Sequence, residues 1–484
     1  MLTQMDTASE TRAHKLAMRR LFARQSARRK LRGDGRNGTV GGAGGALGDM
    51  GELLGAGHGE GHTLPLRIFV YELPIWANTK IIKRNPWCTD SVFGTEQFIH
   101  EAILNNTFGV RTWDPEDADF FYVPIYPTCL VYRDFGNFKK YRYLIERVLE
   151  HIVNDYPYWV RSHGRDHIWP FVHDFGGCLS WLDNTDRVYF ENLRHSIFLS
   201  HLGDLNVGCF QTYKDVVIPP MVSDPYLVEQ SQGGLTIPPA QRKTFAHFRG
   251  TVNWCVVGGA RVGGVVVGGG GCVVCCLLVR PPLPPHLSSL PPFLPSSLLP
   301  LPHPRNPPQP RYHANPEADL KIDRGYSKDY SKGVRQLLQK TYRDDTLVKI
   351  YEGATKSYYK EVEDAVFCLC PRGFAAWSRR LFDSVLLGCI PVIIADNVEL
   401  PFESFLDYRS FSVKIAEKDT TRVKEILLNI PREVIREKQR MLLKVWPHFT
   451  YQRPAKKGDA FDMIMRRLMK RLPNFAVVAG DRWT

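Results

Sequence analysis

The sequence predicts an α/β protein made of two Rossmann-like lobes, each built around a largely parallel β-sheet. Short apolar runs alternate with amphipathic segments along most of the chain, which is typical of strands and helices that form parallel sheets. The clearest unit is an apolar run at 365–369, a Pro-Arg-Gly turn, helical spacing over 378–387 and a continuous apolar run at 390–394. Consecutive apolar residues are expected in a parallel strand that is covered on both faces. The chain has 484 residues, which is enough for two such lobes.

The other elements follow from the same patterns, taken in order along the chain. In the N-terminal lobe, at 63–245, the sequence predicts strands at 68–71, 120–123, 168–172, 216–218 and 244–248, and helices at 95–104 and 141–153. In the C-terminal lobe, at 312–472, it predicts a helix at 333–342, a strand at 347–350 and a helix at 357–364 before the unit described above. Closing helices are expected at 432–446 and 461–472.

Two segments belong to neither lobe. Residues 1–62 are basic and then glycine-rich, and we expect them to be disordered. Residues 252–311 pass from a Val/Gly/Cys-rich to a Pro/Leu/Ser-rich composition, which is unusual for a loop within a compact fold. Because a G-rich start followed by a pyrimidine tract would be translated in this way, we interpret 252–311 as a retained intron. The alternative is a polyproline linker or SH3-type ligand.

The positive charge of the chain is not a sign of nucleic-acid binding. The formal net charge is +13, of which 1–62 and 252–311 contribute +4 each, so the two lobes carry +5. They lack the clustered basic face with interleaved aromatic residues that binding to nucleic acid requires. We therefore expect no nucleic-acid partner.

Several motifs, in a consistent order, resemble the exostosin-type glycosyltransferases, most closely the plant and algal members that build cell-wall polysaccharides such as xylan. In the C-terminal lobe these are CPRG at 370–373, S-x-R at 378–380, GCIPVIIAD at 388–396 and LPF at 400–402. The other motifs are RIFVYELP (67–74), DPEDADFFYVPIYPTC (114–129), HIWPFVHDFGGC (167–178), FRG (248–250) and GDAF (458–461). The resemblance implies the GT-B arrangement, in which two Rossmann-like lobes enclose a cleft. It also implies inverting transfer of a sugar from a UDP-sugar to a polysaccharide or glycan acceptor.

The candidate nucleotide-sugar site lies where the strands of the C-terminal lobe end, because ligands of parallel α/β sheets bind at the carboxyl ends of strands. Without a metal, arginine must stabilise the departing diphosphate, and Arg372 and Arg249 are the residues that we expect to do so. Asp383 stands where the family usually has Glu, which the resemblance implies contacts the ribose. The predicted set is Arg249, Gly250, Arg372, Gly373, Ser378, Arg379, Arg380 and Asp383.

The catalytic base is expected in the N-terminal lobe, and the sequence leaves two candidates. His173 and Asp174 end a predicted strand opposite the nucleotide site, and either could accept a proton from the acceptor hydroxyl. In the alternative interpretation HDFGG is a tight turn, in which Gly176 and Gly177 permit positive φ and Asp174 caps the chain.

No metal or other cofactor is expected beyond the UDP-sugar co-substrate. Asp117 and Asp119 form a DxD sequence, which in other glycosyltransferases holds a metal. Here the pair precedes a predicted strand, where two solvated carboxylates are ordinary, and the resemblance also implies a structural role.

The cysteines and the N-terminus bear on the location of the protein. Seven cysteines lie outside 252–311; several recur in the family pattern, which fits the lumen of the secretory pathway, and an odd number leaves at least one free thiol. The resemblance implies a type II Golgi membrane protein that acts on the lumenal side. No stretch of 18 apolar residues is present, so we expect that the anchor was lost through a wrongly placed start codon; the alternative is a solubly expressed variant. The alternative function is a non-catalytic glycosyltransferase-like subunit of a polysaccharide synthase complex, and other such subunits are candidate partners.

Overall fold

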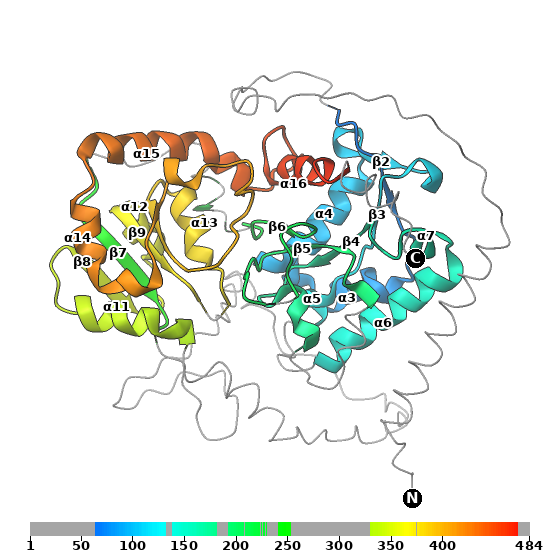
Figure 1. Cartoon of the computed structure of the whole chain (residues 1–484), viewed down its shortest axis with the longest axis horizontal. Coiled ribbons are helices and arrows are strands. Elements are labelled where there is room, and N and C mark those ends of the chain that lie inside the picture. Colours follow the sequence, from blue (N-terminus) through cyan, green and yellow to red (C-terminus); the bar gives the residue numbers. More distant parts are fainter. Residues whose placement is uncertain are drawn as a thin grey trace, which may run out of the picture.

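The computed structural model describes residues 63–472 apart from 132–137, 182–191, 208, 223, 225, 228, 230–240, 253–329 and 374. The two segments that belong to neither predicted lobe, 1–62 and 252–311, therefore lie outside the described residues, except for Val252. Figure 1 shows the described part as two β-sheets that lie side by side, each packed against helices.

The first sheet has six strands in the order β2-β1-β3-β4-β5-β6, and all neighbouring strands are parallel. Its strands are β1 (Ile68–Val70), β2 (Arg111–Thr112), β3 (Phe120–Tyr122), β4 (His167–Phe171), β5 (Ile197–Ser200) and β6 (Val216–Val217). Its helices are α3 (Thr79–Arg84), α4 (Thr95–Leu104), α5 (Pro127–Val131), α6 (Phe138–Asp155) and α7 (Tyr158–Ser162). The patterns described above did not predict β5, which is only four residues long.

The second sheet has five parallel strands in the order β11-β10-β9-β7-β8. Its strands are β7 (Thr244–Gly250), β8 (Val348–Glu352), β9 (Ala365–Pro371), β10 (Ile390–Ile394) and β11 (Val413–Lys414). Its helices are α11 (Val334–Tyr342), α12 (Tyr358–Glu363), α13 (Arg379–Leu386), α14 (Val423–Leu428) and α15 (Arg432–Val445). Because β7 precedes 253–329 and its neighbours follow it, this sheet is assembled from both sides of the low-complexity segment.

The β9–α13–β10 unit forms as its sequence predicts. All five residues of β10 are buried, as is expected of a parallel strand covered on both faces. Helix α13 turns Leu381, Phe382 and Val385 into the core, where each is at most 5% exposed. Burying a side chain such as that of Phe382 contributes roughly 2–3 kcal/mol to stability, so this face of the helix holds α13 on the sheet.

The last described helix, α16 (Ala460–Met469), returns the chain to the first sheet. Figure 1 shows it between the two sheets. Its residues Met463 and Ile464 are fully buried, and Arg471, which follows the helix, donates hydrogen bonds to the carbonyl oxygens of Tyr213 and Asp215. The C-terminal part of the chain therefore joins both sheets.

The carboxyl ends of the two sheets meet through backbone contacts. Asp204, which follows β5, forms an antiparallel bridge with Val398, which follows β10. The amide of Glu399 donates to the carbonyl of Gly203 at 2.8 Å. A Cβ atom at Gly203 would lie 2.1 Å from the Glu399 oxygen, so only glycine permits this approach. The edges at which ligands of parallel sheets bind thus face each other here.

Three disulfides and one free thiol account for the seven cysteines outside 252–311. The disulfides join Cys88 to Cys129, Cys178 to Cys209 and Cys368 to Cys389, and Cys370 is free and buried. The expected free thiol is confirmed. Among the helices that the structure describes, none is long and apolar enough to cross a membrane.

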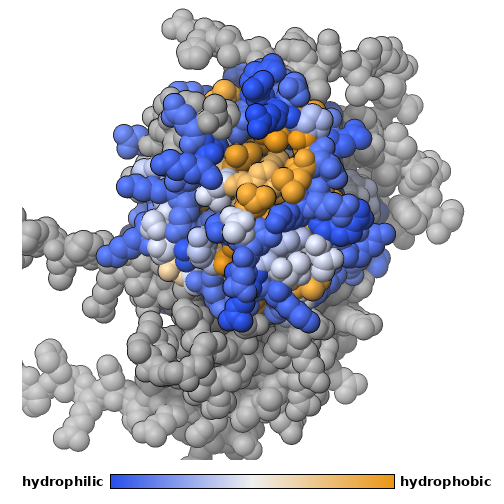
Figure 2. All heavy atoms as spheres, turned by 90° about the vertical axis from the view of Figure 1, so that its left-hand side faces the viewer, coloured by the Kyte–Doolittle hydropathy of each residue, from blue (hydrophilic) through white to orange (hydrophobic). Residues whose placement is uncertain are grey.

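The surface on the side of the second sheet has polar and apolar areas. Figure 2 presents the side of the second sheet, which is mostly hydrophilic and carries one large apolar area besides smaller ones. Helices α14 and α15 carry exposed apolar side chains at Leu428 and Val434, which are 53% and 41% exposed.

Candidate active site

Arg380 occupies the carboxyl end of the second sheet. Its Nε donates to the backbone oxygen of Arg249 at 2.6 Å, and its guanidinium lies over the ring of Phe248 at 4.9 Å. A Cβ atom at Gly250 would lie 1.6 Å from Arg380 Nη2. Gly250 therefore makes room for the guanidinium, and Ser378 lies beside it with 3.4 Å between Oγ and Arg380 Nη1.

A second arginine, Arg335 of α11, lies on the same aromatic ring. It is 3% exposed, and its guanidinium lies 5.6 Å from the centre of the Phe248 ring. Nε donates to the carbonyl of Arg372 at 3.0 Å, and Nη1 donates to the carbonyl of Thr251 at 2.9 Å. Burial, together with the charge of Arg380, lowers the pKa of Arg335 to about 9. A bound anion would stabilise both cations, because it opposes their mutual repulsion.

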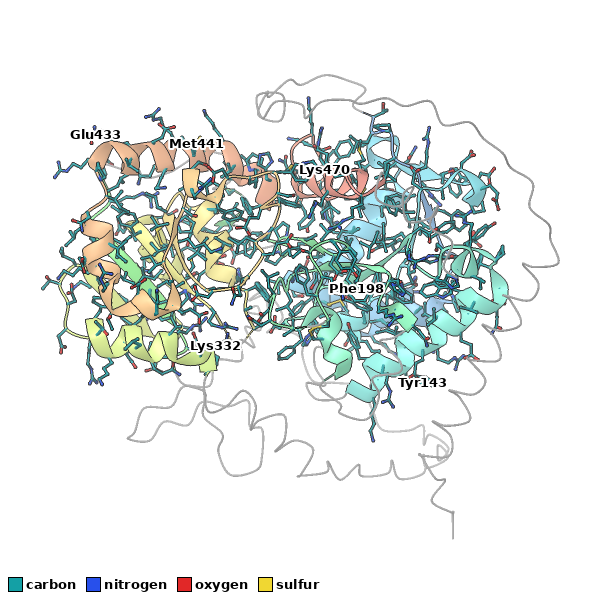
Figure 3. The ribbon with its side chains drawn as sticks, viewed as in Figure 1. Tyr143, Phe198, Lys332, Glu433, Met441 and Lys470 are labelled. Carbon is teal, nitrogen blue, oxygen red and sulfur yellow. A yellow bond between two sulfur atoms is a disulfide. The ribbon has the colours of Figure 1, made fainter. Side chains whose placement is uncertain are left out.

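Sequence reasoning missed Arg335 because an arginine in an amphipathic helix is usually exposed. The signal that was present is its position next to the buried Val334, at the first turn of α11. Gly373 leaves room for this arginine, since a Cβ atom added there would lie 3.2 Å from Arg335 Nη2. Figure 3 shows the side chains between the two sheets, with Phe198 of β5 on one side and Lys332, which precedes α11, on the other.

Arg372 lies at the contact between the two sheets. It is 6% exposed, and its guanidinium lies 3.4 Å from a carboxylate oxygen of Asp204 and 3.2 Å from one of Glu417. Asp204 follows a strand of the first sheet, and Glu417 follows β11 of the second. The predicted role of Arg372 in binding diphosphate stays a prediction; in this structure its charge is opposed by two carboxylates.

The side chain of Arg249 lies on the opposite face of β7 from Phe248, because successive residues of a strand alternate. It forms a two-point ion pair with Glu361 of α12, at 2.6 and 3.2 Å, and lies over Tyr351 at 4.5 Å. His247 Nε2 is 3.0 Å from the same carboxylate. These groups line a pocket of about 250 Å³ together with Thr244 and Asp364. The backbone oxygen of Arg249 therefore contacts Arg380, whereas the Arg249 guanidinium lies in this separate pocket.

Asp383 is a residue of α13, and its carboxyl group faces Tyr358 of α12. It is 2% exposed and accepts hydrogen bonds from Tyr358 Oη at 3.1 Å and Arg379 Nε at 3.3 Å. Burial raises its pKa, against the effect of Arg379. Arg379 also donates to Tyr359 Oη at 3.2 Å. These partners hold the carboxyl group in place, and its predicted contact with a ribose stays a prediction.

The HDFGG segment after β4 forms a tight turn. The amide of Gly176, whose φ is +50°, donates to the carbonyl of His173 at 2.7 Å. His173 Nδ1 accepts from the amide of Phe175 at 3.2 Å, so His173 provides the cap that was expected of Asp174. Burial lowers the pKa of His173 to about 3 and raises that of Asp174 to about 6. Of the two candidate bases, Asp174 has the pKa closer to neutrality.

Another histidine, which the sequence did not single out, lies beside this turn. His201 follows β5, and its ring stacks with that of Phe93, which in turn stacks with His173. The ring of His201 also lies beside Trp377, in the loop between β9 and α13 of the second sheet, with 5.3 Å between ring centres. The loops after β4, β5 and β9 thus bring imidazole and indole groups together.

The two acidic residues considered as metal ligands lie elsewhere. Asp119 accepts a hydrogen bond from the amide of Arg67 at 2.8 Å, and both it and Asp117 are exposed. Within the described ranges no group of three His, Cys, Asp or Glu side chains is arranged to hold a metal ion.

Comparison with known proteins identifies the family. A family model described as "Exostosin GT47 domain" matches residues 63–260 and 296–430. The chain belongs to the exostosin GT47 family. The resemblance inferred from the motifs is thus confirmed, and the GT47 chain is a glycosyltransferase.

The curated relatives of this GT47 protein are plant proteins that align along most of their length. A "probable glucuronosyltransferase" of Oryza sativa subsp. japonica is 30% identical over 432 residues, which cover 87% of this chain and 86% of the relative. The "probable beta-1,4-xylosyltransferase IRX10" of Arabidopsis thaliana is 30% identical over 420 residues, which cover 84% and 83%. A "probable glucuronosyltransferase" of Physcomitrium patens is 29% identical, with 84% and 76% covered.

Proposed function

We propose that this protein is an inverting glycosyltransferase of GT-B architecture, which transfers a sugar from a UDP-sugar to a polysaccharide acceptor. The observation that carries the proposal is the pair of arginines at the carboxyl end of the second sheet. Arg335 and Arg380 flank Phe248, next to a glycine without room for a side chain. Among the described residues, their hydrogen-bond partners are backbone carbonyls, the hydroxyl of Ser378 and the phenol of Tyr330. This environment suits a diphosphate, which supplies the negative charge that they lack.

The reaction needs one bond formed and one broken. The acceptor hydroxyl attacks C1 of the sugar, and the bond from C1 to the terminal phosphate oxygen breaks. The electron pair leaves with the diphosphate, where Arg335, Arg380 and the N-terminus of α13 stabilise the added charge. Arg372 joins them if the diphosphate displaces its carboxylate partners. The hydroxyl proton passes to a base of the first sheet, for which Asp174 is the better candidate because its pKa is about 6.

The sheet contact supports a cleft between two lobes. The loops after β5 and β10 are hydrogen-bonded to each other, so the two carboxyl edges face one another. In this arrangement the second sheet holds the nucleotide and the first holds the acceptor. We also propose that the protein acts in the Golgi lumen, where an oxidising environment would maintain its three disulfides.

The relatives suggest which donors to test first. Their names contain xylosyl and glucuronosyl transfer, so UDP-xylose and UDP-glucuronic acid lead the panel, followed by the galactosyl and arabinosyl donors. Release of UDP by the purified full chain, with xylan oligosaccharides as acceptor, tests the proposal. Turnover of one donor supports it. If the chain binds none of these donors and releases no UDP, the non-catalytic subunit replaces the enzyme as the function.

A further inference from the structure

Two aromatic side chains with unused polar atoms face each other across the contact between the sheets. His201 follows β5 of the first sheet, and Trp377 precedes α13 of the second. Their rings are 5.3 Å apart at an angle of 63°. Phe93 covers the imidazole on another side, with ring centres 6.4 Å apart. Neither the motifs nor the names of the relatives assign a role to His201 or Trp377.

Three nitrogen atoms of this pair are buried without a hydrogen-bond partner among the described residues. They are Nδ1 and Nε2 of His201, which is 2% exposed, and Nε1 of Trp377. A buried polar group that forms no hydrogen bond destabilises the folded protein. In folded proteins an ordered water or a bound molecule satisfies most such groups. Three of them at the meeting edges of two sheets indicate a place where a ligand binds.

The nitrogen atoms define the chemistry of that ligand. Burial, with a smaller effect of the neighbouring His173, lowers the pKa of His201 to about 3, so the imidazole is neutral and offers one donor and one acceptor. The indole of Trp377 offers one donor. A phosphate at neutral pH offers acceptors and little donation, and it would leave the imidazole acceptor unused. A sugar hydroxyl both donates and accepts, and a sugar ring has apolar faces that can pack against aromatic rings.

The position of His201 and Trp377 indicates which part of a UDP-sugar they would contact, namely the sugar that is transferred. Trp377 directly precedes Ser378, which lies beside Arg380 at the proposed diphosphate site. The sugar of a UDP-sugar is bonded to the terminal phosphate and must lie next to that site. His201 approaches from the other sheet, three residues before Asp204, whose ion pair with Arg372 fixes this loop. We infer that His201 and Trp377 bind the hydroxyl groups of the sugar that is transferred. This inference rests on the proposed function.

Removing the nitrogen atoms while keeping the rings tests it. In the full chain, His201→Phe and Trp377→Phe should each raise KM for the UDP-sugar that the wild type uses by about tenfold or more, since each removes hydrogen bonds to a buried group. Binding of UDP itself, which has no sugar, should stay within about twofold by calorimetry, because the diphosphate contacts remain. His201→Gln keeps one donor and one acceptor and should recover most of the lost affinity.

Trp169→Phe is the matched control. Its indole nitrogen is also buried without a hydrogen-bond partner in the described part of the chain, but it lies in β4, within the core of the first sheet. This variant should leave both UDP binding and KM unchanged. If His201→Phe does not fold, His201→Gln and Trp377→Phe decide the question.

Two outcomes would overturn the inference while the proposed function stands. One is an unchanged KM in the substituted chains, and the other is an equal loss of affinity for UDP and for the UDP-sugar, which would assign the pair to the nucleotide. A wild-type chain that binds UDP but turns over no UDP-sugar would instead remove the proposed function, and the inference with it.

Discussion

Arg372 and Asp204 form an ion pair that joins the two sheets, with 3.4 Å between Nη2 and Oδ2. The side chains are 7% and 11% exposed, so solvent screens this pair little. Glu417 is the second partner of the guanidinium at 3.2 Å. A diphosphate that binds Arg372 must therefore compete with these carboxylates. Binding of a diphosphate to Arg372 would therefore affect the contact that holds the two sheets together.

Replacing Arg372 should affect both turnover and stability. Arg372→Ala removes a charge-stabilising group, so we expect kcat to fall by about 10². It also leaves Asp204 and Glu417 without their partner, which should cost about 3 kcal/mol of unfolding free energy. Arg372→Lys should recover little, because a point charge replaces a fork. Kinetics and thermal unfolding measure the two effects.

The control for this substitution is Arg409→Ala, whose side chain is 91% exposed and pairs with Asp407. It should leave kcat and the melting temperature near those of the wild type. Turnover at the wild-type rate in Arg372→Ala would exclude the catalytic role. An equal loss of turnover in Asp204→Asn would assign the effect to the ion pair instead.

Gly250→Ala should disrupt the proposed diphosphate site although it replaces no charged residue. The new Cβ would lie 1.6 Å from Arg380 Nη2, so the guanidinium must leave the ring of Phe248. Because the arginine would then be misplaced for the leaving group, we expect kcat/KM to fall by about 10². Gly353→Ala is the control, since open space surrounds a Cβ there although φ is +82°. Equal activity in the two variants would contradict the assignment of Arg380.

The pH dependence of activity distinguishes the two candidate bases. The carboxylate of Asp174 is the form that accepts a proton, and it predominates above its raised pKa of about 6. With Asp174 as the base, kcat/KM should fall about tenfold per pH unit below 6. His173, whose pKa is lowered to about 3, stays neutral across this range and would give a flat profile. A limb near pH 6 that persists in Asp174→Asn would rule out Asp174.

The raised pKa of Asp174 also makes the stability of the fold depend on pH. Stability should decrease as the pH rises, whereas activity should increase. The folded-state pKa of Asp174 is raised from 3.8 to about 6, so its protonated form favours folding. This contribution is complete below about pH 4 and is lost as the pH rises through 6. Thermal unfolding of the wild type and Asp174→Asn across this range, in which only the wild type should show the loss, checks the shift.

The length of the messenger RNA tests the interpretation of 252–311 as a retained intron. Amplification of cDNA across codons 245–320 should give a product about 60 codons shorter than this sequence requires, because the composition breaks at both ends of the segment. The family match leaves 261–295 uncovered. Mature message that contains only the full-length product would contradict the interpretation.

The success of the sequence predictions depended on how local each feature is. The β9–α13–β10 unit was predictable because its apolar residues are consecutive in the strands and helically spaced between them. Arg249 and Gly250 are adjacent in sequence, yet the Arg249 guanidinium lies in another pocket, because strand residues alternate. Arg335 and His201 were missed, since their burial arises from elements far apart along the chain. No local pattern marks such residues.

The decisive test of the proposed function is transfer of xylose from UDP-xylose to a xylan oligosaccharide. The reaction is run in excess chelator, and the product is examined by NMR. UDP-xylose is α-linked, so inversion predicts a product lengthened by one β-linked xylose. Arginine in place of a metal predicts that the chelator leaves the rate unchanged. With UDP-glucuronic acid as the donor, inversion predicts one β-linked glucuronic acid in the product, and the chelator should again leave the rate unchanged. An α-linked product, or activity that is lost with chelator and restored by manganese or magnesium, would contradict the account.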